Sequence, residues 1–432
     1  MAGFIKKQPP ARIIAVGFLA VILIGSLLLF LPVSLNDGVK LGYVDALYTS
    51  VSAVCVTGLN TIDPGSTFSV FGKIILALLI QIGGLGVASV GAGVIIAIGK
   101  RVDMKSRNVL KEALNLDSRG GVVRFLGNVF LTTAVIELAG AVAGFFVFRS
   151  EYPVPEAIGI SLFHSVASFN NSGFDIFGKG TNMIPYKNNL PLNLITATLI
   201  ILGGIGFPVI KEVLHKKFRV KKLSMHSRVV ISVSTILTVV GMLLLRLTEN
   251  ISWLGAFFTS VSARTAGFST CPLSDFTNAG RVVMLFLMFV GASPGSTAGG
   301  IKTTTLFVLL QGIKSSATNR SEKAFHYSVP ENAFKKAAVI TLIGIAVVTA
   351  GTFVMSAAEP SLALSDILLE VVSAFGTVGL STGITPTLSL GSKLLSMVIM
   401  YIGRLGPLTI ATMWYFSNGE RSRYPEGNIA IG

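Results

Sequence analysis

Four short loops, each ending in a glycine, are the segments of this chain whose residue types and spacing could do chemistry. We call them the glycine loops: Val56-Thr57-Gly58, Asn171-Ser172-Gly173, Thr265-Ala266-Gly267 and Thr377-Val378-Gly379. Glycine reaches backbone dihedrals closed to other residues, so successive carbonyl oxygens can point the same way. Rings of such carbonyls replace the hydration shell of K⁺. The fourth loop and the residue after it, Thr377-Val378-Gly379-Leu380, differ from the TVGY core of potassium channels only at Leu380. The glycine loops therefore predict a cation site made of backbone oxygens.

Other kinds of chemistry have little support in the sequence. The two cysteines and four histidines among 432 residues have no metal-site spacing. No H-E-x-x-H or G-x-S-x-G pattern occurs. The stretch from Gly295 to Thr303 approaches a phosphate-binding loop, but it carries one residue too many and no strand precedes it. We therefore predict no catalytic residues and expect that the protein is not an enzyme.

A run of small and helix-breaking residues interrupts the third of four similar apolar segments. The run consists of Gly291, Ala292, Ser293, Pro294, Gly295, Ser296, Thr297, Ala298, Gly299 and Gly300. Such a composition disfavours a continuous helix. Irregular backbone at membrane depth survives only where it is buried in protein or lines a water-filled cavity. We predict a broken helix that lines the cavity beneath the glycine loops; a kinked helix is the alternative.

Several polar residues in apolar segments need partners. Arg404 lies in the middle of the last apolar segment, where a lone cation costs several kcal/mol unless it faces water or a partner. Lys302 either acts beside it or extends its side chain to the membrane surface. Arg264 and Asn170 directly precede glycine loops and are expected to brace them from behind. Glu137 requires a buried partner that the sequence does not identify.

Acidic residues are expected on the outer side of the glycine loops. They are Asp45, Glu156, Asp175 and Asp366. Such carboxylates can raise the local concentration of cations at a pore mouth. The alternative for each is an ordinary helix cap or a solvated loop residue.

The composition places these residues in a membrane. The chain is 51% hydrophobic and 13% charged, with a mean hydropathy of +0.74, whereas soluble domains carry about 25% charged residues. Several apolar runs reach the roughly 20 residues needed to cross a bilayer.

Basic linkers divide the chain into four similar units, predicted at 1–101, 102–222, 223–322 and 323–432, the last with a short tail. Each unit contains an apolar helix, a semi-apolar stretch, a glycine loop and a second apolar helix. The first helices are predicted near 13–32, 123–148, 229–247 and 337–358, and the second helices near 70–99, 191–214, 281–312 and 391–416. The semi-apolar stretches, such as 46–53 and 256–263, are too short to span and are predicted to be re-entrant pore helices. The predicted fold is an all-α integral membrane protein with four repeats of first helix, pore helix and second helix in pseudo-fourfold arrangement: eight transmembrane helices and four re-entrant pore helices.

The net charge of +15 has a topological explanation. Most of the 35 basic residues lie in the linkers and at the two ends of the chain. By the positive-inside rule, both termini and the three linkers are expected in the cytosol. Nucleic-acid binding is not expected, since the charge does not form a separate basic domain.

The repeats, with the Gly-Gly-x-Gly pattern that begins at Gly83 and at Gly203 and its variant Gly403-Arg404-Leu405-Gly406, resemble the Trk/Ktr/HKT superfamily of potassium transporters, most closely the Ktr membrane subunit. The resemblance covers the whole chain, including the tail from Arg423 to Gly432. It implies that the glycine loops form a selectivity filter that binds K⁺. Glycine at all four filter positions implies a preference for K⁺. The resemblance also implies that the run 291–300, with Lys302 and Arg404, forms a gate.

Further expectations follow from the resemblance alone. The protein would lie in the plasma membrane of a bacterium as a homodimer, surrounded by lipid, on a cytosolic ring of Rossmann-type (RCK/KTN) subunits that bind ATP or ADP. A requirement for Na⁺ stays open. The alternatives are a secondary transporter of another small solute, which inverted repeats would favour, a less selective K⁺/Na⁺ pathway, and a scaffold without transport, which leaves the glycines unexplained.

Overall fold

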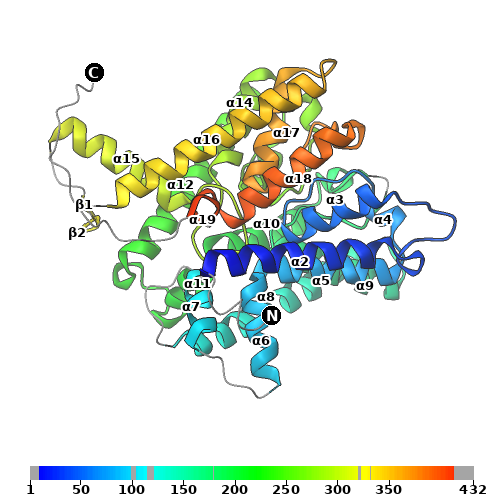
Figure 1. The fold of residues 1–432 in the computed structure, drawn as a ribbon, viewed down its shortest axis with the longest axis horizontal. Coiled ribbons are helices and arrows are strands. Elements are labelled where there is room, and N and C mark those ends of the chain that lie inside the picture. Colours follow the sequence, from blue (N-terminus) through cyan, green and yellow to red (C-terminus); the bar gives the residue numbers. More distant parts are fainter. Residues whose placement is uncertain are drawn as a thin grey trace.

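The computed structural model describes residues 9–98, 104–113, 121–178, 180–319, 323–330 and 332–412. Helices and their connections make up nearly all of this part of the chain (Figure 1). The only sheet among the described residues is an antiparallel pair, β1 (Lys323–Ala324) and β2 (Tyr327–Ser328), in which Lys323 lies opposite Ser328.

One sequence of elements occurs four times. The long first helices are α2 (Pro10–Phe30), α8 (Val122–Phe148), α12 (Met225–Thr248) and α16 (Ala333–Ala358). The short pore helices are α3 (Tyr43–Val54), α9 (Val154–Phe169), α13 (Trp253–Ser262) and α17 (Leu364–Gly376). The second helices begin as α5 (Val70–Leu85), α10 (Leu190–Ile205), α14 (Asn278–Phe289) and α18 (Leu390–Leu405). The long helices match the predicted first helices to within about a turn.

All of the second helices begin in the same way. The residue before each helix accepts a hydrogen bond from the backbone N–H three positions later, through Ser69, Asn189, Thr277 and Ser389. Ser, Thr and Asn are preferred at this position because their side-chain oxygen satisfies a donor that the first turn leaves free. The four starting points therefore have a common local cause in the sequence.

The prediction of continuous second helices was wrong in the first, second and fourth repeats. α5 and α10 end at Gly86 and Gly206, and each continues at a 99° bend as α6 (Val87–Ala97) or α11 (Phe207–His215). α18 ends at Gly406 and continues as α19 (Pro407–Thr412), beyond which the predicted helix lies outside the described residues. These three glycines have φ of 85°, 94° and 89°, which ends a helix and is open to glycine at little cost. An apolar pattern alone does not reveal such a break.

The second helix of the third repeat is interrupted more extensively. Residues 290–302 separate α14 from α15 (Thr303–Thr318), and we call residues 290–301 of this segment the break loop. The interruption predicted for 291–300 is therefore present as irregular backbone and not as a kink.

Four helices of the described chain are long and apolar enough to cross a membrane, and two bent pairs raise that number to six if each counts as one span. One face of each long helix carries exposed large apolar side chains; Phe146, Leu247 and Phe353, for example, are 73%, 81% and 74% exposed. A continuous apolar exterior of this kind is what hydrocarbon solvates.

The repeats pack in a ring. The second helix of each repeat packs against the pore helix of the next: α5 against α9, α10 against α13, α14 against α17, and α18 against α3. The last contact joins the end of the chain to its beginning, as the neighbouring α18 and α3 in Figure 1 show. The order around the axis is therefore the order in the sequence, which gives the pseudo-fourfold arrangement.

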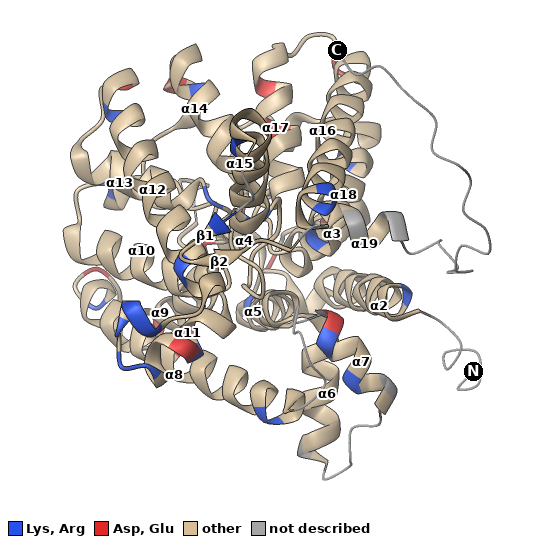
Figure 2. Ribbon diagram, turned by 90° about the vertical axis from the view of Figure 1, so that its left-hand side faces the viewer, with Lys and Arg blue, Asp and Glu red and all other residues tan. Residues whose placement is uncertain are grey.

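The remaining elements are short. α7 (Met104–Ala113), which was not predicted, packs against α2, α6 and α8. The others are α4 (Pro64–Thr67), η1 (Pro32–Ser34), η2 (Ile184–Tyr186), η3 (Val220–Lys222), η4 (Leu273–Asp275) and η5 (Thr385–Thr387). Lys and Arg gather around α7, α11 and β1 (Figure 2), at what we call the linker end. Of the predicted unit boundaries, that at 222 falls at the end of η3, and those at 101 and 322 lie outside the described residues.

Candidate ion-binding site

The glycine loops follow the carboxyl ends of the pore helices and meet one another in a closed ring. A Cβ atom added to Gly58 would lie 2.3 Å from the carbonyl oxygen of Ser172, and one added to Gly379 would lie 2.1 Å from that of Thr57. The other two contacts are Gly173 with the Cα of Gly267 (2.9 Å) and Gly267 with the carbonyl of Val378 (2.3 Å). Each glycine thus abuts the next loop, and the fourth abuts the first.

The backbone of the glycine loops repeats as well. Each loop begins with a left-handed residue: Val56, Asn171, Thr265 and Thr377 have φ of 56°, 56°, 72° and 50°. The closing glycines have φ of 90°, 67°, 79° and 93°. A non-glycine residue in this region costs about 1–3 kcal/mol and persists only where the surroundings hold it. Such strain, repeated at the same place in every loop, indicates a function for this backbone shape.

Hydrogen bonds to the pore helices hold the loops in place. The middle residue of three loops donates its N–H to a carbonyl five residues earlier: Thr57 to Ser52 (2.8 Å), Ser172 to Ala167 (2.9 Å) and Val378 to Ser373 (2.8 Å). In the third loop, the N–H of Ala266 donates instead to the carbonyl of Ser262, four residues earlier (2.9 Å). The third loop is thus one residue tighter, a difference that the apolar pattern did not reveal.

Serine hydroxyls support only part of the ring. Gly58 N–H donates to the Ser52 hydroxyl and Gly379 N–H to the Ser373 hydroxyl, both at 3.0 Å. The second repeat has Ala167 at this place. The first and fourth loops are therefore alike, and the second loop is held differently.

Two cavities lie on opposite sides of the ring. The outer cavity, of about 450 Å³, is lined by Gly58, Gly267 and Gly379 and by the carboxylates of Asp63 and Asp175. The inner cavity, of about 160 Å³, is lined by residues of the three helix breaks, by the break loop and by Lys302 and Arg404. The glycine ring therefore separates two polar chambers inside a protein with an apolar exterior.

The break loop fills much of the space beneath the ring. It closes on itself through the N–H of Gly291 and the carbonyl of Ile301 (2.8 Å). It is tied to the second repeat, where Ser293 N–H donates to Gly204 O (3.0 Å). It also reaches the fourth glycine loop, since Gly299 N–H donates to the hydroxyl of Thr377 (3.1 Å).

Arg404 joins three repeats beneath the ring. Its guanidinium donates to the carbonyls of Thr297 in the break loop and of Gly83 and Gly84 at the end of α5. It makes no salt bridge, because the ion pairs among the described residues are Arg281–Asp366 and Lys393–Asp45.

Lys302 turns back onto the break loop. Its ammonium donates to the carbonyls of Ala298 (2.7 Å) and Gly299 (3.2 Å). It does not extend to the membrane surface. Together with Arg404 it places two cationic side chains at the inner cavity.

Asn170 and Arg264 both tie a glycine loop to helices behind it. Asn170 donates its amide to the side chains of Gln81 (2.8 Å) and Glu137 (3.0 Å), so Asn170 is the partner of Glu137 that the sequence did not identify. Arg264 donates to the carbonyl of Ser234 in α12 (2.8 Å).

Sequence reasoning missed the role of Glu370. This fully buried carboxylate in α17 accepts hydrogen bonds from the hydroxyls of Ser381 (2.7 Å) and Thr385 (2.5 Å). It thereby fixes the segment that leaves the fourth glycine loop. An acidic residue in the middle of a pore helix, between apolar neighbours, was the available signal.

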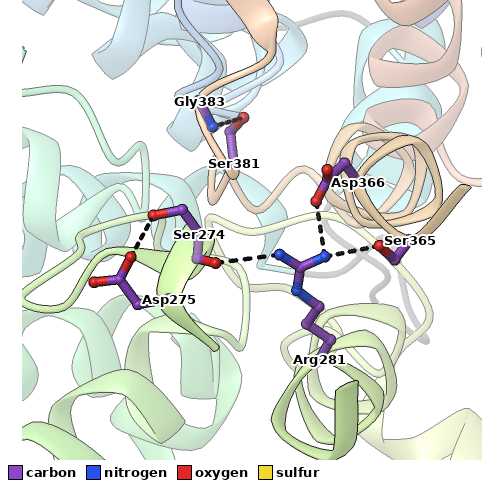
Figure 3. A network of polar contacts seen from close by, with 7 residues as sticks. All are labelled: Ser274, Asp275, Arg281, Ser365, Asp366, Ser381 and Gly383. Carbon is purple, nitrogen blue, oxygen red and sulfur yellow. Dashed lines mark hydrogen bonds and ion pairs between the residues drawn. The ribbon is translucent and has the colours of Figure 1, made fainter. Parts of the chain in front are cut away.

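Two of the four acidic residues expected to enrich cations are engaged in ion pairs instead. Asp366 pairs with Arg281 at 2.9 Å, in a network that includes Ser365 (Figure 3). Asp45 pairs with Lys393 at 3.0 Å. Each pair joins a second helix to the pore helix of the next repeat, so neither carboxylate is available at the pore mouth.

The other two acidic residues differ from each other. Glu156 is exposed in the first turn of α9. Asp175 lines the outer cavity, where burial and the neighbouring Asp63 raise the pKa of its carboxyl to about 7. Asp63 and Asp175 are thus the two acidic residues of the described chain that line the outer cavity, and Asp63 was not among the predicted residues.

The all-α architecture, the apolar exterior and a ring of backbone loops between two polar cavities define a membrane transport protein of the pore-loop type. The chain matches the family described as TrkH, cation transport protein, over residues 8–251 and 223–418. The chain belongs to this family, which confirms the resemblance found in the sequence and the expectation that it is not an enzyme.

The similarity to named relatives extends over nearly the whole chain. It is 36% identical to the potassium/sodium uptake protein NtpJ of Enterococcus hirae, with 99% of this chain and 98% of that protein covered. It is 35% identical to the Ktr system potassium uptake protein B of Bacillus subtilis, with the same shares covered. The crystal structure of the potassium transporter TrkH from Vibrio parahaemolyticus has the same fold, with a TM-score of 0.72 at 20% identity over 92% of this chain and 86% of that one.

Proposed function

We propose that this chain is the ion-translocating membrane subunit of a potassium uptake system. The observation that carries the proposal is the closed ring of glycine loops between the outer and inner cavities. Backbone oxygens in such a ring can replace the hydration shell of K⁺. The names of the relatives, which are potassium or potassium/sodium uptake proteins, support the same ion.

The charge distribution supports a direction of transport. The basic linker end faces the cytosol under the positive-inside rule, with both termini on the same side. The outer cavity then opens outward, and its two carboxylates attract cations. An inside-negative potential contributes about 2.3 kcal/mol per charge per 100 mV to inward movement, so no chemical step is needed to drive uptake.

The break loop, together with Lys302 and Arg404, forms the gate in this proposal. This part of the proposal is supported by two contacts of the break loop, one with Thr377 in the fourth glycine loop and one with Gly204 in the second repeat. Two cationic side chains at the inner cavity raise the barrier to a cation that leaves the filter. Opening requires that the loop leave this position.

A partner controls the gate. The proposal includes a homodimer on a cytosolic ring of Rossmann-type (RCK/KTN) subunits that bind ATP or ADP. It is supported by the relationship to Ktr system proteins. The described part of the chain contains no alternating strand–helix fold of the kind that binds nucleotides. Nucleotide control would therefore act through the cytosolic ring of partner subunits.

A less selective K⁺/Na⁺ pathway is the second candidate. It is favoured by the second glycine loop, in which Asn171 and Ser172 depart most from the potassium-channel pattern, and by the name of the Enterococcus relative. Uptake measured separately for the two ions distinguishes the candidates, and uptake of K⁺ with and without Na⁺ tests for Na⁺ activation.

The test of the main proposal is growth at low external K⁺ of bacteria that lack their own potassium uptake. We expect growth when the chain and its cytosolic partner are expressed together. Gly379→Val should abolish growth, since a Cβ there lies 2.1 Å from the carbonyl of Thr57. Gly391→Val is the matched control, because nothing lies within 4 Å of its added Cβ.

Two results would count against the proposal. Absence of growth with both wild-type proteins present at the membrane would exclude potassium uptake. Equal growth with Gly379→Val and Gly391→Val would remove the glycine ring from the pathway and favour a secondary transporter of another solute.

A further inference from the structure

A crevice between α10, α12 and α13 lies apart from the two cavities on the pore axis. Its volume is about 290 Å³, near the lower end of the roughly 300–1,000 Å³ typical of ligand pockets. Its walls are mainly apolar, with Ile201 and Val239 at the rim. These two side chains are 43% and 44% exposed, so the crevice opens on the surface that faces lipid.

Among the residues that the structure describes, Arg264 is the only charged one that lines this crevice. Its guanidinium donates to the carbonyl of Ser234 (2.8 Å), to the Ser234 hydroxyl (3.1 Å) and to the hydroxyl of Thr238 (3.2 Å), all of them neutral. Its buried Nε has no partner. Neither ion pair of the described chain includes it. Because arginine stays charged in proteins, a cation without a counter-ion lies at the base of an apolar crevice.

We propose that this crevice binds the carboxylate end of a fatty acid drawn from the bilayer, with Arg264 as the counter-ion. A carboxylate matches the planar guanidinium and can accept two parallel hydrogen bonds from it. The apolar walls would cover the first part of the chain, and the rest would lie among the surrounding lipid. Nothing in the proposed potassium uptake requires this site.

Depth favours a fatty acid over a phospholipid. Ser234 lies nine residues beyond the start of α12 at Met225, which places it roughly 14 Å along the helix axis. A phosphodiester head group with two chains remains near the bilayer surface, whereas a single-chain carboxylate can reach this level through the crevice. The small volume also favours a single chain.

The crevice extends to the pore machinery. Gly204, Ala292 and Asn171 line its inner wall. The carbonyl of Gly204 anchors the break loop through Ser293 N–H. A bound fatty acid would therefore pack against that anchor and hold the break loop in place, so we expect it to reduce K⁺ flux; this effect, unlike binding itself, rests on the proposed function.

Binding is tested with laurate and with 1-dodecanol, which has the same chain length and no charge. Spin-labelled laurate is displaced by each compound from the purified full-length chain in delipidated detergent micelles. We expect laurate to displace the probe at a concentration at least about tenfold lower than dodecanol. Arg264→Gln should weaken the binding of laurate by about tenfold and leave the binding of dodecanol unchanged. Equal displacement by laurate and dodecanol from the wild-type chain overturns the proposal.

A second pair of variants avoids Arg264, because that residue also ties a glycine loop to α12. Val239→Trp fills the crevice, whereas Leu243→Trp lies one turn further along α12, is similarly exposed at 43% and does not line the crevice. We expect laurate binding to be lost only with Val239→Trp. Equal binding by both variants would show that the crevice is not the binding site. In liposomes, laurate should lower K⁺ uptake by the wild type but not by Val239→Trp. A chain that takes up no K⁺ at all contradicts the proposed function and leaves the binding result intact.

Discussion

At the scale of single residues, the ring of glycine loops depends on the absence of side chains at four positions. An alanine or serine at Gly58 meets two obstacles at once. Its φ of 90° strains any residue with a Cβ, and that Cβ would approach the carbonyl oxygen of the neighbouring loop. The carbonyl must then move, which changes the oxygen cage for every ion that passes.

Gly58→Ser should therefore reduce the discrimination between K⁺ and Na⁺. We expect the ratio of K⁺ to Na⁺ uptake to fall by roughly tenfold, equivalent to about 1.4 kcal/mol. Uptake of the two ions into cells or liposomes measures the ratio. Gly38→Ser is the control: its φ is 79°, yet nothing lies within 4 Å of its added Cβ. An unchanged ratio in folded Gly58→Ser would place Gly58 outside the filter.

Asp175 predicts a dependence of uptake on external pH. A carboxyl with a pKa of about 7 is ionised at higher pH and neutral at lower pH. At low K⁺ we expect uptake to be at least roughly twofold faster at about pH 8 than at about pH 6, since a charged mouth concentrates cations. Asp175→Asn should be slow at both values. Glu156→Gln, on an exposed turn, should keep the wild-type dependence; a wild-type rate independent of pH contradicts the role given to Asp175.

At the scale of elements, the breaks in the second helices open the space beneath the ring. Glycines end α5, α10 and α18 at equivalent places, and the break loop takes the place of the fourth break. The repeated Gly-Gly-x-Gly pattern was visible in the sequence, but it was equally compatible with close packing of a continuous helix. A bend requires a positive φ at its last glycine, and that depends on tertiary contacts that no local pattern encodes.

Gly206 and Gly86 separate the effect of strain from the effect of contact. An alanine Cβ at Gly206 would lie 2.6 Å from the carbonyl of Pro294 in the break loop, whereas at Gly86 the nearest atom is 3.9 Å away. Both positions have a similar positive φ. We expect Gly206→Ala to displace the break loop and raise K⁺ flux measured without the cytosolic partner, while Gly86→Ala leaves that flux near wild type. An equal change of flux in both variants would show that backbone strain at the glycine, and not contact with the break loop, causes the effect.

At the scale of the whole molecule, Arg404 and the ring bring together residues that are far apart in the sequence. Arg404 of the fourth repeat bonds to the first and the third. The sequence was sufficient to predict the four repeats, the pore helices and the glycine loops, because each has a local signal that occurs four times. It was insufficient for the ion pairs of Asp45 and Asp366 and for the partner of Glu137, because these contacts occur once and depend on the order of repeats around the axis.

Arg404→Gln should raise K⁺ flux in the absence of the partner. The change removes a positive charge from the inner cavity and weakens the hold on the break loop. We expect about a tenfold increase, equivalent to about 1.4 kcal/mol in the barrier, which is small beside the repulsion between two unit charges in a protein interior. Flux into liposomes that contain the purified chain measures it. Lys393→Gln, at the other end of α18, is the control and should not raise the flux. An unchanged flux in folded Arg404→Gln would show that the charge of Arg404 has no role in the gate.

The contact of the last repeat with the first has a consequence for the connectivity of the chain. α18 packs against α3, α19 packs against α2, and the hydroxyl of Tyr401 donates to the carbonyl of Ala15 at 2.6 Å. The seam between the ends of the polypeptide is therefore built like the three covalently linked seams. Circular permutation that joins the fourth unit to the first and opens the chain at another basic linker would preserve every contact between neighbouring repeats. The pore then depends on the contacts between neighbouring repeats and not on which of the linkers is open.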